Sequence, residues 1–187
     1  MGFFYTNMTI KELYNIFLQN PNICTDTRKI EKESIFFALK GDNFNGNKFA
    51  SQAIDKGCLF AIIDEEKYQT PKAILVNDVL ETLQELATYH RNRLTIPIIG
   101  ITGTNGKTTS KELINAVLSS EKKCYATKGN LNNHIGVPLS ILEIKNTHEI
   151  AIIEMGANHK SEINFLCNIS KPTHGVITNI GSAHLEG

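Results

Sequence analysis

The chain has 187 residues, of which 41% are hydrophobic and 20% charged, a composition typical of a globular protein. Lysine plus arginine and aspartate plus glutamate number 19 each, so no net charge attracts the chain to nucleic acid or to a membrane surface. Its longest apolar runs, such as 96–101, are too short to span a bilayer, and its first residues lack the pattern of an export signal.

The cysteines are widely separated and show no paired metal-ligand spacing. In a chain without an export signal, this spacing indicates reduced thiols in the cytoplasm rather than a disulfide framework or a zinc site. The four cysteines are Cys24, Cys58, Cys124 and Cys167.

The first half of the chain predicts a small mixed α/β domain over residues 1–78. An amphipathic helix is expected at 9–19, with Thr9 as its N-cap, and a second short helix should end at Gly57. Strands are expected at 35–39, 59–63 and 73–76. A connecting helix is expected within 79–94.

From residue 95 to 187, strands and helices alternate, which predicts a second α/β domain with a mostly parallel sheet. Strands are expected at 98–102, 123–127, 149–155 and 174–179, and helices at 107–119, 134–142 and 161–168. The runs at 149–155 and 174–179 are apolar without alternation, which favours strands covered on both faces. Ligands of such sheets bind at the carboxyl ends of the strands, so the loops after three of these strands should face one site.

The loop after the first of these strands, IIGITGTNGKTT at 98–109, predicts an ATP or GTP site of the P-loop type. Gly103 and Gly106 allow a tight turn that turns backbone amides toward phosphate oxygens, and the following helix directs its positive end there. Lys107 would contact the β- and γ-phosphates, and the Thr108 hydroxyl would bind Mg²⁺. The glycines at 100, 103 and 106 are spaced by threes, and Ile101 stands where the common P-loop pattern has its first glycine.

Polar residues follow the other strands as well. Glu154 either binds Mg²⁺ or caps a neighbouring helix, and His184 either binds a metal or lies in an ordinary surface loop. Asn132 and Asn133, before the 134–142 helix, either form its N-cap or reach a phosphate or metal-bound water. The residues leave these alternatives open.

Four segments together resemble the Mur ligases, ATP-dependent enzymes that form amide bonds in peptidoglycan precursor synthesis. They are GITGTNGKTT (100–109), GNLNNHIGVPLSIL (129–142), IIEMGANHKSEI (152–163) and NIGSAHLEG (179–187). The third and fourth are most similar to members that add D-alanyl-D-alanine (D-Ala-D-Ala) to UDP-N-acetylmuramoyl-tripeptide (UDP-MurNAc-tripeptide). A member that adds the third amino acid would be expected to show a Glu-Val-Ser-Ser-His type run in place of the third segment.

The first half resembles the uridine-diphosphate-binding domain of the same family. The resemblance centres on Asp26-Thr27-Arg28 and the Ala-Leu-Lys-Gly run at 38–41, while a triplet that is typically Asp-Gly-His reads Asn45-Gly46-Asn47 here. Family members continue beyond the equivalent of Gly187, so the chain is expected to be a fragment that is inactive by itself. Residues that bind adenine and D-Ala-D-Ala would lie past its end.

The resemblance implies a cytoplasmic, monomeric enzyme of cell-wall biogenesis, cell shape and division, with ATP and Mg²⁺ as cofactors and no nucleic-acid or membrane partner. Its catalytic residues would be Lys107, Glu154 and His184, and its metal ligands Thr108, Glu154 and His184. Residues expected to bind ATP are Gly103, Thr104, Asn105, Gly106, Lys107, Thr108, Thr109, Asn132 and Asn133. Residues expected to bind the uridine-linked substrate are Thr27, Arg28, Asn45, Gly46 and Asn47.

Competing interpretations of the sequence are another amide ligase of the superfamily, such as the one that adds the third amino acid or a folylpolyglutamate synthase. A P-loop nucleoside triphosphatase without ligation chemistry and a non-catalytic assembly protein are further alternatives.

Overall fold

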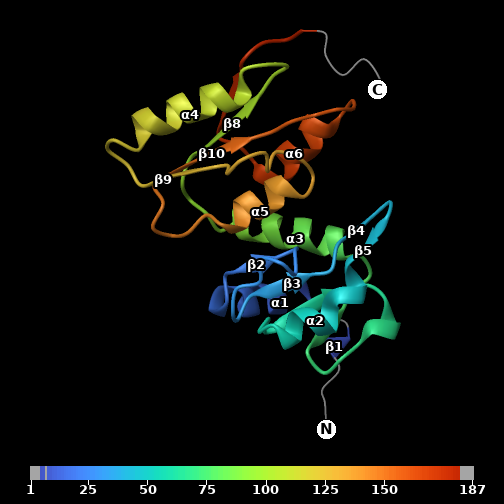
Figure 1. Cartoon of the computed structure of the whole chain (residues 1–187). Helices are drawn as coiled ribbons and strands as arrows, with labels where there is room; N and C mark the ends of the chain where they lie inside the picture. The colour runs from blue at the N-terminus through green and yellow to red at the C-terminus, as the bar shows by residue number, and fades with distance from the viewer. Residues whose placement is uncertain (1–4, 7, 182–187) are drawn as a thin grey trace. The chain divides into compact units, whose positions relative to one another are not determined.

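The computed structural model describes residues 5–6 and 8–181, and the chain divides between Leu86 and Ala87 into two compact units (Figure 1). The division falls within helix α3 (Val79–Arg91), where the sequence predicts a connecting helix. None of the helices that the described residues form is long and apolar enough to cross a membrane. All four cysteines are free thiols.

The first unit contains a five-stranded sheet in the order β1-β7-β6-β3-β2, in which all neighbouring strands are parallel. Its strands are β1 (Tyr5–Thr6), β2 (Ile23–Cys24), β3 (Ile35–Phe37), β6 (Phe60–Ile63) and β7 (Ala73–Leu75). Its helices before α3 are α1 (Ile10–Gln19), α2 (Ala50–Asp55) and the 3-10 turns η1 (Gly46–Phe49) and η2 (Glu66–Tyr68). A short antiparallel hairpin joins β4 (Lys40–Gly41) to β5 (Phe44–Asn45).

Local sequence signals fix where α1 begins and where α2 ends. The Thr9 hydroxyl accepts a hydrogen bond from the Glu12 amide, and the Glu12 carboxylate accepts one from the Thr9 amide, so a capping box begins α1. Gly57 has a φ of 109°, a conformation that side chains disfavour, and it follows the end of α2. Both predicted boundaries are confirmed.

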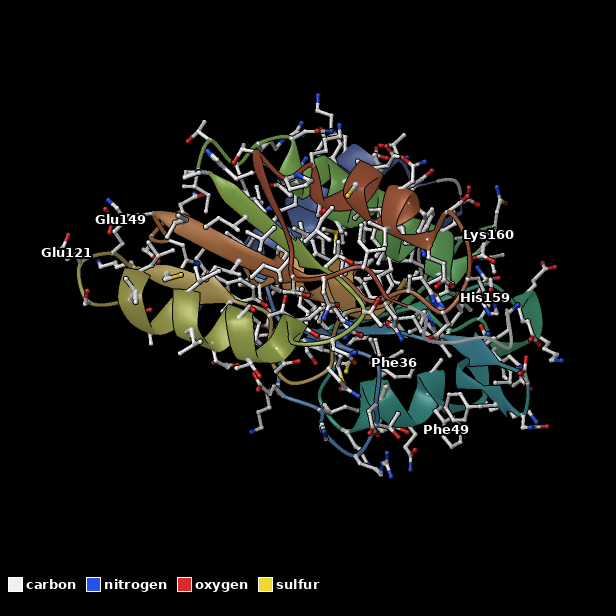
Figure 2. The ribbon with its side chains drawn as sticks, turned by 90° about the horizontal axis from the view of Figure 1, so that it is seen from above. Phe36, Phe49, Glu121, Glu149, His159 and Lys160 are labelled. Carbon is white, nitrogen blue, oxygen red and sulfur yellow. The ribbon has the colours of Figure 1, made fainter. Side chains whose placement is uncertain are left out.

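The core of the first unit is built on the middle of its sheet. Ile35, Phe36 and Phe37 of β3 are buried, as are Ala61 and Ile63 of β6. Phe49, which Figure 2 labels near Phe36, is partly buried against the part of this core that contains Phe36, Ala61 and Ile63. Burial of this apolar surface is the main force that holds the unit together.

The second unit contains a four-stranded sheet in the order β11-β8-β10-β9, also parallel throughout. Its strands are β8 (Ile98–Thr102), β9 (Cys124–Ala126), β10 (Ile150–Glu154) and β11 (His174–Ile177). Its further helices are α4 (Lys107–Leu118), α5 (Gly136–Leu142) and α6 (Glu162–Ser170). Figure 1 shows α4 on one side of this sheet and α5 and α6 on the other. The predicted α/β class and the parallel sheet are confirmed.

Strands β10 and β11 are both expected from the sequence to be covered on both faces, but they differ in burial. All five residues of β10 are buried between β8 and β9, as predicted. The expected cover on both faces of 174–179 is not seen among the described residues, where β11 is the outer strand and Ile177 is 62% exposed. Within the described residues, no strand pairs with the outer edge of β11.

Because the strands are parallel, their carboxyl ends share one edge of the sheet. Figure 2 shows this polarity along β10: Glu149, just before the strand, and His159, beyond its end, lie at opposite ends of the unit. Glu121, in the loop after α4, lies at the same end as Glu149. The glycine-rich loop therefore lies at the end where ligands of parallel sheets bind.

Candidate nucleotide site

The glycine-rich loop follows β8 and leads into α4. Gly103 and Gly106 have φ values of 137° and 79°, in the region that favours glycine, and Gly106 is the N-cap of α4. A Cβ atom at position 103 would also collide with the Thr178 side chain. The two glycines that the sequence singles out are therefore required by backbone conformation, and at position 103 also by space.

The start of α4 provides the groups that bind a phosphate chain. The first four amides of a helix have no partner within the helix, and the helix dipole places partial positive charge at the same end. The Lys107 ammonium lies over the loop and donates to the carbonyl oxygens of Gly103 and Thr104, at 2.7 and 3.2 Å. Amides and one cation thus lie together where a polyanion would bind.

Residues after β11 hold the first part of this loop in place. The Asn105 amide donates to Asn179 Oδ1 at 2.9 Å, and the Thr178 hydroxyl donates to the Asn105 carbonyl at 2.6 Å. The Thr104 amide donates to the Asn179 carbonyl, and its hydroxyl exchanges hydrogen bonds with the backbone of Gly181. The shape of the loop therefore depends on segment 178–181 as well as on its own glycines.

The Glu154 carboxylate lies beside the start of α4, at the carboxyl end of β10. Its Oε1 atom accepts hydrogen bonds from the Thr108 hydroxyl at 3.2 Å and from the Asn132 amide group at 2.9 Å. The carboxyl group is 1% exposed. Thr108, Asn132 and Glu154, each predicted from a different segment, are thus brought together.

Oxygen atoms of this cluster are suitable for Mg²⁺. No hydrogen-bond donor among the described residues reaches the buried Oε2 atom of Glu154. Mg²⁺ in proteins is often held by one or two carboxylates, with phosphate oxygens and water as further ligands, and a carboxylate beside a threonine hydroxyl at a phosphate-binding loop fits that pattern. No group of three or more His, Cys, Asp or Glu side chains that could hold a metal by itself occurs in residues 5–6 and 8–181.

Asn133, the neighbour of Asn132, has a different role. Its side-chain oxygen accepts hydrogen bonds from the amides of Ile135 and Gly136, at 3.1 and 2.8 Å, and so caps the approach to α5. The capping alternative therefore holds for Asn133, whereas Asn132 turns to the Glu154 carboxylate, a contact that neither alternative named. Contact of Asn132 with a phosphate or a metal-bound water stays a prediction. A Cβ atom at Gly136 would collide with the backbone of Leu131, so this turn requires glycine.

A cavity of about 600 Å³ opens beside the loop and is walled by the segments before α5 and α6. Its lining includes Lys107, Asn132, Asn133, His134, His159 and Phe165. The Glu162 carboxylate, also in the lining, accepts hydrogen bonds from the Asn158 and His159 amides, and these bonds lower the pKa of the carboxyl group. The cavity combines amide, imidazole and aromatic groups, which suits a polar ligand with an apolar portion.

The predicted substrate residues of the first unit form two separate groups. The exposed Arg28 guanidinium binds the Asp26 carboxylate in a fork, with contacts of 2.7 to 3.1 Å, and lowers the pKa of Asp26 to about 2. Thr27, between them, is half-buried, and its carbonyl accepts from the Lys56 ammonium. These three residues therefore form one polar turn, in which Arg28 is exposed and Asp26 and Thr27 are half-buried.

The second group, Asn45-Gly46-Asn47, is tied into the protein. The fully buried Asn47 side chain donates to Asn45 Oδ1 and Asp64 Oδ1 and accepts from the Asp64 amide. Gly46 is buried against Leu39, where a Cβ atom would overlap the backbone. A substrate role for this triplet stays a prediction, and the structure gives Asn47 a complete set of internal partners. His184 lies outside the described residues.

Sequence reasoning missed Lys111, Thr127 and Thr178 as residues that surround the site, and it placed Asn179 at a strand end without giving it a role. A signal existed for Lys111, because it follows Lys107 by four residues and Thr108 by three and therefore shares their helical face.

Comparison with protein families gives two matches that together span most of the chain. The Mur ligase family model described as the catalytic domain matches residues 21–99, and the Mur ligase middle domain matches residues 101–187. The chain belongs to the Mur ligase family.

Within that family, the chain is similar to MurF ligases. UDP-N-acetylmuramoyl-tripeptide–D-alanyl-D-alanine ligase of Synechocystis is 46% identical over 167 residues, which cover 88% of this chain and 37% of the relative. The Bacillus subtilis ligase of the same name is 40% identical, with 97% of this chain and 42% of the relative covered. The chain thus spans about two fifths of the length of these curated relatives.

The chain is also similar to solved structures of MurF ligases. MurF from Acinetobacter baumannii is 38% identical with a TM-score of 0.82, over 88% of this chain and 36% of that one. MurF ligase from Thermotoga maritima, solved in complex with ADP, is 32% identical with a TM-score of 0.81, over 90% of this chain and 39% of that one.

Proposed function

We propose that this chain supplies the ATP-binding loop and the uridine-nucleotide-binding domain of a ligase that adds D-Ala-D-Ala to UDP-MurNAc-tripeptide. The observation that carries the proposal is the cluster of the glycine-rich loop, Thr108 and Glu154, in a chain whose two halves both match Mur ligases. The proposed domains are residues 1–78 and 95–187, with 79–94 as the connection.

The proposed reaction has two steps. A peptide carboxylate oxygen attacks the γ-phosphorus of ATP, and the bond from that phosphorus to the β-phosphate oxygen breaks. ADP is released, and the peptide carboxyl group becomes an acyl phosphate. The amine of D-Ala-D-Ala then attacks the acyl carbon, and phosphate leaves as the amide forms and the amine loses a proton. The first step brings two anions together, so catalysis depends on positioning and on charge neutralisation.

Each loop residue has a defined task in this proposal. The backbone of residues 103–109, together with Asn133, would orient the phosphate chain. The Lys107 ammonium would exchange its hydrogen bonds to the Gly103 and Thr104 carbonyls for contacts with the β- and γ-phosphates. Thr108 and Glu154 would hold Mg²⁺, while Asn132 keeps the carboxylate turned toward Thr108. When bound, Mg²⁺ supplies positive charge to the triphosphate. By family resemblance, His184 would assist a second ion.

The first unit is proposed to bind the uridine diphosphate end of the acceptor. Thr27 and Arg28 lie in the same polar turn, and the exposed Arg28 offers a planar cation suited to a diphosphate once it leaves Asp26. Asn45, Gly46 and Asn47 complete the proposed substrate set as residues that shape the neighbouring loop.

Calorimetric titration of the chain with Mg²⁺-ADP, and separately with UDP-MurNAc-tripeptide, tests the proposal. Binding of both ligands is expected. Nucleotide binding without acceptor binding would instead indicate a nucleoside triphosphatase module. Absence of nucleotide binding would contradict the proposal as a whole. A matched titration with UDP-MurNAc-dipeptide separates the tripeptide ligase from the member that adds the third amino acid.

A further inference from the structure

Lys111 is a buried lysine that the proposed reaction does not use. It lies in α4, one helical turn after Lys107, and its side chain is 0% exposed. Its ammonium donates to the Thr127 carbonyl at 2.7 Å and lies 3.7 Å from Glu154 Oε2. The exposed Glu112 carboxylate approaches the same ammonium at 3.1 Å.

Burial of this ammonium needs a reason beyond packing. Removing a charged group from water costs several kcal/mol unless partners replace its hydration, so lysine is rarely buried without them. A leucine or methionine would fill such a position without that cost. The partners that Lys111 meets include the buried carboxylate that we propose as a metal ligand.

The two oxygens of Glu154 have different surroundings. Oε1 accepts from Thr108 and Asn132, on the side of the phosphate-binding loop. Oε2 has no hydrogen-bond donor within reach among the described residues and has the Lys111 ammonium as its nearest cation in an ion pair. The electrostatic attraction of Lys111 therefore acts on the oxygen that points away from Thr108.

Thr127 completes this arrangement. Its hydroxyl accepts a hydrogen bond from the Glu154 amide at 3.0 Å, while its carbonyl receives the Lys111 ammonium. One residue thus fixes both the backbone at position 154 and the cation that faces its side chain. The end of β10 and the first turns of α4 are held in register by these contacts.

We propose that Lys111 is a positioning residue for the magnesium site: it holds Glu154 by Oε2, so that Oε1 faces Thr108 and meets the metal-nucleotide complex already oriented. This inference rests on the proposed function. It assigns Lys111 no contact with nucleotide or metal. Its effect should appear in the dependence of nucleotide binding on Mg²⁺.

The test measures ADP affinity by calorimetry with Mg²⁺ and with EDTA, and compares the ratio of the two affinities among variants. Lys111→Met should lower this ratio about tenfold, because loss of residues that orient metal ligands typically reduces metal affinity by that factor or more. ADP affinity in EDTA should change less than about threefold. Glu112→Gln, which removes the exposed partner of the same ammonium, is the matched control and should leave the ratio within about twofold.

The outcomes separate this inference from the proposed function. A wild-type chain that binds ADP equally with and without Mg²⁺ would contradict the metal site itself. A normal wild-type ratio that Lys111→Met leaves unchanged would overturn the role of Lys111 alone. If Lys111→Met does not fold, the double variant Lys111→Met/Glu154→Gln, which removes both buried charges, is tested by circular dichroism. A restored fold supports the pairing, whereas a double variant that also fails to fold places Lys111 in the core and overturns the proposal.

Discussion

The backbone amide of Asn105, in the glycine-rich loop, donates a hydrogen bond to the side-chain oxygen of Asn179, a residue 74 positions later in the chain. Thr178 and the backbone of Asn179 add further contacts to the same loop. The loop that we propose to bind phosphates is therefore fixed by a segment that does not itself take part in the P-loop pattern.

Asn179→Ala should weaken binding of Mg²⁺-ADP about three- to tenfold, because one hydrogen bond contributes on the order of 1 kcal/mol and the loop loses its fixed shape. Calorimetry with ADP provides the measurement. Asn146→Ala, at an exposed turn, serves as the control and should bind as the wild type does. Equal affinities of the two variants would show that Asn179 does not order the loop.

Gly103→Ala should destabilise the second unit by about 1–3 kcal/mol and weaken ADP binding, because alanine disfavours a φ of 137° and its Cβ would meet Thr178. Thermal unfolding of this variant is compared with Gly175→Ala. Gly175 lies in β11, and apart from its chain neighbours no atom of the described residues lies within 4 Å of the place that an alanine methyl group would take. The Gly175→Ala chain should therefore unfold near the wild-type temperature. A Gly103→Ala chain as stable as that control would contradict the assigned backbone constraint.

Glu154→Gln should raise the Mg²⁺ concentration needed for half-maximal ADP binding by at least about tenfold, since a neutral amide is a poorer ligand for Mg²⁺ than a carboxylate. A magnesium titration at fixed ADP concentration gives this value. Glu143→Gln removes a carboxylate whose partners are Lys128 and Tyr125 rather than residues of the loop, and it is expected to leave the midpoint unchanged. Identical midpoints for wild type and Glu154→Gln would show that Glu154 is not a Mg²⁺ ligand and that its role is structural.

Acidification should destabilise the second unit through His90. Burial lowers the pKa of this imidazole from 6.5, and its Nε2 atom lies 2.9 Å from the Ile144 carbonyl. The unfolded chain therefore binds a proton near pH 6.5, whereas the folded chain binds it only at a lower pH. Stability falls as the pH drops below that value, with a limiting slope of about 1.4 kcal/mol per pH unit for one proton.

Denaturant unfolding between pH 7.5 and 5.5 measures this slope, and His90→Gln should make it shallower. The remaining slope includes His148, whose pKa burial also lowers. Parallel pH profiles of wild type and His90→Gln would exclude His90 as the source.

Much of the site could be predicted from the sequence because its residues follow recognisable local patterns. Gly103, Gly106 and Thr108 belong to a contiguous motif, and Glu154 ends an apolar strand that parallel topology places beside it. The prediction that the loops share one edge needed only parallel strands. The structure adds that β10 pairs directly with β8, so Glu154 lies next to the strand that leads into the loop.

Other features depend on contacts between segments far apart in the chain. The sequence does not reveal that the Lys111 ammonium faces Glu154, because a lysine on a helix is usually solvated. The exposure of β11 differs from the prediction, since an apolar run without alternation favours cover on both faces but does not say which segments provide that cover. The short strands β1 and β2 have only two residues each, too few to produce a periodic pattern.

The central claim is that the backbone of residues 103–109 and the Lys107 ammonium hold the phosphate chain of a nucleotide. Calorimetric titration of the wild-type chain, Lys107→Ala and the exposed-site control Lys122→Ala with Mg²⁺-ADP tests it most directly. Wild type and Lys122→Ala should bind with similar affinity, and Lys107→Ala should bind at least about tenfold more weakly with an unchanged unfolding temperature. Equal binding by all three proteins would contradict the account.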